Sequence, residues 1–144
     1  MFSFITIFFI AFILNFLWEE WHSRFYVHYN GKPITHAILV YASSFDAFVT
    51  VIGALLFEYV PPFQERLWLV LASLLIFAIG LEIFALRTKR WAYKLARTGG
   101  PSMPIIPGLG VGLTPSIQLA FLAYLSYSVA ARVVTFLPLY ALYK

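Results

Sequence analysis

The sequence has no cysteine and few charged residues. Without cysteine there can be no disulfide, no thiolate nucleophile and no cysteine-bound zinc or iron–sulfur cluster. Charged residues make up 11% of the chain and apolar residues 62%, whereas typical soluble domains have about 25% and about 45–50%. A soluble core cannot absorb so much apolar surface, so the composition predicts an integral membrane protein.

Common catalytic motifs are also missing. We find no glycine-rich phosphate loop, no nucleophile elbow and no zincin motif. The sequence therefore predicts no cofactor and no resident metal. The formal net charge of +4 could suggest nucleic acid, but the basic residues sit at the ends of apolar runs, which is the pattern of membrane topology. We expect no nucleic-acid partner.

Four stretches are long enough to cross a membrane, because a spanning helix needs about 20 mostly apolar residues. They cover residues 2–21, 34–60, 64–86 and 114–137, and the third could continue to residue 95. Gly31 and Pro33 mark the first break, and the Pro61-Pro62 pair marks the second. The sequence thus predicts one domain over residues 1–144, an all-α integral membrane bundle of four transmembrane helices. No cleavable signal peptide is evident, so the first stretch is expected to be retained.

Residues 99–112 contain five glycines and three prolines, which exclude a regular helix. Met103 and several aliphatic residues make this segment too apolar for an ordinary wet loop. Two interpretations stay open. The segment packs into the end of the bundle as a Gly/Pro loop, or it is a tight connection at the membrane interface.

The basic residues predict the orientation. With four spans, the first and third loops share one face and hold seven of the ten basic residues, namely Arg24, Lys32, Arg87, Lys89, Arg90, Lys94 and Arg97. The other face has Arg66, Arg132 and Lys144. The positive-inside rule then places the first and third loops in the cytoplasm and both termini outside. The expected location is a bacterial cytoplasmic membrane.

Three acidic residues fall within the apolar stretches, namely Glu19, Asp46 and Glu82. Asp46 lies ten residues past His36, which is about 15 Å along a helix and close to the middle of the hydrocarbon core. An acidic group there costs at least about 2.5 kcal/mol, so it must face the interior of the bundle. All three acids are predicted to lie in the cytoplasmic half.

The segment 15–26, NFLWEEWHSRFY, contains a polar stripe. Spacings of four, three and four put Asn15, Glu19, His22 and Tyr26 on one face of a helix. We predict Glu19, Asp46 and Glu82 as catalytic acid or base groups. The predicted ligand-binding residues are Asn15, Trp18, His22, Tyr26, Trp91, Tyr93, Met103 and Gln118.

Simpler roles stay open for several of these residues. Asn15 and Gln118 could serve only as hydrogen-bonding contacts between helices. His22 could be solvated at the interface, and the tryptophans could belong to the aromatic belt. Glu19-x-x-His22 also matches one half of a di-iron motif, but no second pair exists in the sequence. A mononuclear site from Glu19, His22 and a further carboxylate is an alternative.

Two motifs resemble known families. Asn15-x-x-Trp18-Glu19, together with Trp91-x-Tyr93, Met103-Pro104 and a Gly-rich segment reaching Gln118, resembles a group of small uncharacterised bacterial membrane proteins. That resemblance implies a four-helix membrane fold and no activity. Asn15-x-x-Trp18-Glu19 is also similar to a motif of membrane-bound terpene cyclases, in which the glutamate helps to protonate an isoprenoid epoxide or alkene. This resemblance would give Glu19 that role.

The leading functional hypothesis is a pocket for a hydrophobic small molecule, an isoprenoid or a lipid, in the cytoplasmic half. A desolvated carboxyl group can donate a proton near neutral pH, so the protein could be an isoprenoid cyclase or isomerase. One alternative is proton or metal-ion transport, for which a homo-oligomer would be expected. Another is a structural assembly subunit. Membrane lipids are partners under every hypothesis.

Overall fold

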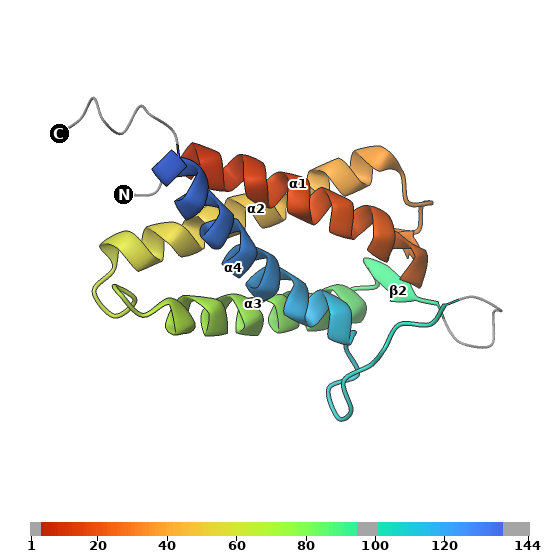
Figure 1. The fold of residues 1–144 in the computed structure, drawn as a ribbon. Coiled ribbons are helices and arrows are strands. Elements are labelled where there is room, and N and C mark those ends of the chain that lie inside the picture. The colour runs from red at the N-terminus through yellow and green to blue at the C-terminus, as the bar shows by residue number, and fades with distance from the viewer. Residues whose placement is uncertain (1–3, 95–100, 137–144) are drawn as a thin grey trace.

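The computed structural model describes residues 4–94 and 101–136, which are mostly helical (Figure 1). The four long helices are α1 (Phe4–His22), α2 (His36–Tyr59), α3 (Leu67–Arg87) and α4 (Leu113–Phe136). Figure 1 shows them running back and forth, so that α1 begins and α4 ends at the same end of the bundle. α1 packs on α2, α3 packs on α4, and α4 also contacts α1.

Two helices begin later than the sequence predicts. α2 begins at His36 because Thr35 is its N-cap and accepts a hydrogen bond from Ile38 N at 3.4 Å. α3 begins at Leu67 rather than at residue 64. Glu65 has a left-handed φ of 59°, which a continuous right-handed helix cannot include. Residues 2, 3 and 137, at the ends of the first and fourth predicted spans, lie outside the described residues.

The structure also contains a small antiparallel sheet, which the all-α prediction missed. A short 3₁₀ helix, η1 (Ser23–Phe25), leads into β1 (Tyr26–Tyr29), which pairs with β2 (Trp91–Tyr93). The prediction of one helix through residue 26 is therefore wrong, and α3 does not continue to residue 95. Lys89 has a φ of 56° and redirects the chain after α3. The aromatic residues of both segments favour the extended pairing.

Several small residues lie in the interior of the bundle, and many large apolar residues face outward. The interior includes Ala11, Ala47 and Ala123, each fully buried. In contrast, Ile5 is 71% exposed and Ile76 is 70% exposed. Small residues let helix backbones approach closely, and they are typical of helix contacts in membranes.

At Gly53, α2 approaches α3 and α4 closely in this way. A Cβ atom at this position would lie 2.5 Å from the Tyr127 hydroxyl and 3.2 Å from Val70 Cγ1. Any side chain here would therefore push α2 away from α3 and α4. The Tyr127 hydroxyl in turn donates a hydrogen bond to Thr50 O at 2.7 Å, which fixes α4 against α2.

Three helical segments of the described chain are long and apolar enough to cross a membrane. They are Phe4–Phe25, His36–Tyr59 and Leu67–Arg87, with mean hydropathy of 1.6, 1.8 and 2.6. The described part of α4 is not among them. Its serines, tyrosines, glutamine and arginine lower its hydropathy.

Candidate functional site

The side-chain amide of Gln118 lies at the centre of the polar residues in the bundle. Its Nε2 atom donates to Glu19 Oε1 at 2.8 Å and to Asn15 Oδ1 at 3.2 Å, both in α1. It also lies 3.2 Å from Asp46 Oδ2 in α2. An amide has two N–H groups for these three acceptors, so at least one hydrogen is shared. Gln118 thus joins α1, α2 and α4, and it brings two carboxyl groups to one point.

α1 positions its two contributors through its helical repeat. Asn15 and Glu19 are four residues apart, which places both on the face toward α4. Asn15 is fully buried, and its Nδ2 donates to Ala11 O at 2.8 Å. This bond leaves Oδ1 free to accept from Gln118 and fixes the orientation of the Asn15 amide. Glu19 and Asp46 are only partly buried, in contrast to Asn15.

Glu82 is held by a separate set of donors from the sheet. It is almost completely buried in α3, and its Oε1 accepts from Trp91 Nε1 at 3.1 Å and from the Tyr93 hydroxyl. The Tyr93 oxygen accepts in turn from Gly112 N at 2.7 Å. β2 therefore carries both donors to Glu82, and the loop before α4 completes the network.

The loop before α4 is partly packed and partly exposed. Met103 and Val111 are buried, whereas Ile105 and Leu109 at the tip are about half exposed. A Cβ atom at Gly112 would lie 2.9 Å from Met103 Sδ, so only glycine permits this approach. Residues 99 and 100 of the predicted loop lie outside the described residues.

Tyr26 lies close to both the Glu19–Asp46 pair and Glu82. Burial raises the pKa of its phenol well above the ordinary value, and the charges of Glu82, Glu19 and Asp46 act in the same direction. Its ring centroid is 5.6 Å from that of Tyr93. Burial, with Glu82 second, also raises the pKa of Tyr93. Both phenols therefore stay protonated and can act as hydrogen-bond donors.

A cavity of about 230 Å³ opens between these groups. All three carboxyl residues, Glu19, Asp46 and Glu82, line it together with Tyr26 and Gln118. Its apolar walls come from α2, α3 and α4, and include Ile38, Leu39, Ala42, Phe45, Ala78, Leu81, Ala85, Pro115 and Leu119. The volume is below the usual range of about 300–1,000 Å³ for small-molecule pockets. The cavity thus suits one narrow ligand segment beside the carboxyls.

His22 lies apart from the carboxyls. It is 1% exposed, and its Nε2 is 2.8 Å from Thr114 Oγ1, which donates to Met103 Sδ at 3.1 Å. The predicted solvated position of His22 is therefore wrong. Within residues 4–94 and 101–136, no group of three or more His, Asp or Glu side chains could hold a metal ion.

The predicted ligand-binding residues divide into three sets. Trp91 lines the cavity with Tyr26 and Gln118. Asn15 and Tyr93 lie behind the cavity wall and hold lining residues in place. The remaining predicted ligand-binding residues, Trp18, His22 and Met103, are not part of the lining.

Arg90 lines the cavity and was missed by the sequence analysis. It belongs to the basic juxtamembrane run, and nothing in that run distinguishes one arginine from another. Its guanidinium lies 5.1 Å from the centre of the Phe84 ring. Tyr41 and Phe45 also line the cavity and were not singled out. Their aromatic side chains are indistinguishable in sequence from the many others in the chain.

Comparisons with protein-family models, curated proteins and solved structures find no match. The function is therefore inferred from the site alone.

Proposed function

We propose that this chain is a four-span membrane protein whose cytoplasmic half binds an isoprenoid or lipid chain and transfers a proton to it. The observation that supports this function best is the cavity itself. Two partly buried carboxyls, Glu19 and Asp46, meet there at the Gln118 amide, within walls that are otherwise mostly apolar. An apolar pocket with a few convergent polar groups is the usual form of a small-molecule site.

The distribution of side chains supports insertion of all four helices. Large apolar residues face outward on α4 as well, where Phe121 is 49% exposed and Val129 is 42% exposed. The interior of α4 contains the small residues Ser116 and Ser126, both fully buried. Water would make this arrangement costly, whereas lipid makes it favourable. Under the positive-inside rule, the end with the sheet and the cavity lies in the cytoplasm and the termini lie outside.

The ligand would enter from the lipid side. Tyr41 and Phe45 line the cavity, and they are also 67% and 39% exposed on the outer surface of α2. The cavity therefore opens through an aromatic side wall next to α3. A hydrophobic molecule can pass from the bilayer through this wall without crossing water, which favours an isoprenoid or lipid over a polar solute.

The paired carboxyls provide the acid. Two carboxylates beside each other in a poorly solvated cavity repel strongly, so one shared proton stabilises the pair. Glu19, at the glutamate position of the cyclase-like motif, would donate this proton to a double bond or epoxide. The pair would recover a proton when the resulting cation loses one. Gln118 holds both groups, and the protonated Tyr26 phenol lines the same cavity.

Native mass spectrometry of the protein in mild detergent tests ligand binding. We expect a discrete bound lipid or isoprenoid on the parent protein. Ala42→Trp fills the cavity and should abolish the adduct. Ala37→Trp, one and a third turns earlier on an exposed part of α2, should retain it. An adduct that survives Ala42→Trp contradicts the proposed site.

Deuterium incorporation tests the chemistry. In D2O the carboxyl pair exchanges its proton, so a ligand alkene protonated by the pair acquires deuterium. The double variant Glu19→Gln/Asp46→Asn should still bind the ligand but should incorporate no deuterium. Glu65→Gln, an exposed change distant from the cavity, should behave like the parent. Equal incorporation in both variants would refute the assigned roles.

A further inference from the structure

A second groove lies beside the carboxyl cavity, and several charged residues line it. Its volume is about 580 Å³. The charged or titratable residues along it are Glu20, Arg24, His36 and Lys94, with Tyr26 at the inner wall. The groove and the cavity have four lining residues in common, namely Ser23, Tyr26, Ile34 and Leu39. The two spaces are therefore adjacent.

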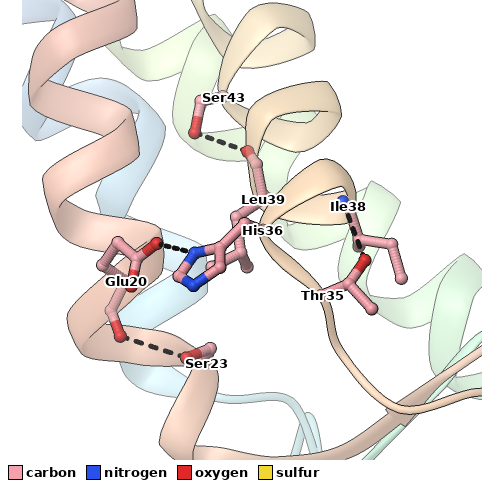
Figure 2. Close-up of polar contacts among 7 residues, drawn as sticks. All are labelled: Glu20, Ser23, Thr35, His36, Ile38, Leu39 and Ser43. Carbon is pink, nitrogen blue, oxygen red and sulfur yellow. Dashed lines mark hydrogen bonds and ion pairs between the residues drawn. The ribbon is translucent and has the colours of Figure 1, made fainter.

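The acidic residue in this groove already has a hydrogen-bond partner. Glu20 Oε1 is 2.7 Å from His36 Nδ1, and Figure 2 shows the two side chains facing each other between α1 and α2. The hydroxyls are engaged as well. Ser23 Oγ donates to Glu20 O at 3.0 Å, and Thr35 Oγ1 caps α2 through Ile38 N (Figure 2). Recognition in the groove therefore depends on its cations.

Two cations in the groove have no acidic partner. The guanidinium of Arg24 lies 4.7 Å from the Trp21 ring centre and 5.2 Å from that of Phe25. These stacking contacts orient the group but do not neutralise it. Lys94 lies beside Phe25, the residue after Arg24, because its backbone N–H donates to Phe25 O at 2.8 Å, and both cations line the groove. Within the described part of the chain, neither cation forms an ion pair with a carboxylate.

We propose that this groove binds the phosphate head of the ligand whose chain occupies the carboxyl cavity. The ligand would be a phosphate-headed amphiphile. Arg24 and Lys94 would bind the phosphate oxygens, because guanidinium and ammonium groups form charge-assisted hydrogen bonds with phosphate. The shared wall at Tyr26 and Leu39 then directs the start of the chain toward the carboxyls. This inference rests on the proposed function, since the cavity must accept the chain.

Binding of three probes to the protein in a neutral detergent tests the proposal. The probes are dodecyl phosphate, dodecanol and inorganic phosphate. We expect dodecyl phosphate to bind at least about tenfold more tightly than dodecanol, as charge-assisted contacts allow. Arg24→Gln/Lys94→Gln should remove this advantage and leave the affinity for dodecanol unchanged. Arg24→Lys/Lys94→Arg keeps both charges and should still bind dodecyl phosphate more tightly than dodecanol.

Lys32→Gln/Arg87→Gln is the matched control, because it removes two charges from the same end of the bundle and neither residue lines the groove. An equal loss in this control would show a general effect of charge and overturn the proposal. Binding of dodecanol without any gain from the phosphate would overturn this inference alone. Failure of both dodecyl probes to bind would overturn the proposed function too. Inorganic phosphate that binds while dodecyl phosphate does not would overturn the connection between groove and cavity.

Discussion

Removing the Tyr93 hydroxyl should destabilise the protein more than the loss of one surface contact. This hydroxyl donates to Glu82 and accepts from Gly112 N at 2.7 Å. In Tyr93→Phe, Glu82 keeps only its 3.1 Å bond from Trp91, and the Gly112 N–H loses its partner. One hydrogen bond is worth about 1 kcal/mol and an unsatisfied buried group costs about 1–3 kcal/mol, so we expect a loss of about 3 kcal/mol.

The free energy of unfolding can be measured by reversible denaturant unfolding of the detergent-solubilised protein. Tyr59→Phe is the matched control. Tyr59 is 56% exposed at the other end of α2, and its hydroxyl makes no hydrogen bond within the described residues. The control should lie within about 0.5 kcal/mol of the parent. If Tyr93→Phe costs no more than Tyr59→Phe, the hydroxyl does not connect Glu82 to the loop, and the argument is refuted.

Three further predictions concern stability. The pKa values of Tyr26 and Tyr93 are raised in the folded protein, so these phenols ionise at lower pH in the unfolded state. The free energy of unfolding should therefore fall as the pH rises above about 10. Thermal unfolding should show a smaller fall in the double variant Tyr26→Phe/Tyr93→Phe. Gly53→Ala should cost about 1–3 kcal/mol by overpacking, whereas Gly80→Ala, with no atom within 4 Å of the new Cβ, should not destabilise the protein in the same assay. Gln118→Leu removes the donor shared by Asn15, Glu19 and Asp46, which should cost about 1–3 kcal/mol. The thermal midpoint should fall by several degrees. An unchanged midpoint would contradict the central position of Gln118.

The helices can be predicted from the sequence because their apolar runs are long and the residues that interrupt them, such as proline, are incompatible with a helix interior. The paired prolines after α2 end that helix wherever the tertiary contacts lie. Glu19, Asp46 and Glu82 were predicted in one half of the bundle, and in the structure all three line one cavity. Gln118 lies within hydrogen-bonding distance of Glu19 and Asp46 there.

The sheet did not follow from the sequence, because each of its strands is too short to show a periodic pattern. Residues 26–29 directly follow a helix and read as its continuation. They become extended only by pairing with β2, more than sixty residues later. This pairing carries Tyr26 and Trp91 to the cavity and Tyr93 to Glu82. The same tertiary contact determines which basic residue lines the cavity, so Arg90 could not be told from its neighbours in the sequence.

The hydroxyl groups further along α2 and α4 from the carboxyls allow a test of the rival hypothesis of proton transport. A relay needs side chains that can pass a hydrogen from one to the next. Thr50 Oγ1 donates to Asp46 O at 2.8 Å, and Ser126 and Ser128 donate to carbonyls four residues earlier in their own helix. The Tyr127 hydroxyl crosses between helices, but it also ends on a backbone carbonyl, that of Thr50. A carbonyl accepts a hydrogen bond and has no hydrogen to pass on. These four hydroxyls therefore form separate contacts rather than a chain. This arrangement favours exchange of protons between the carboxyl pair and a ligand in the cavity over transfer across the bundle.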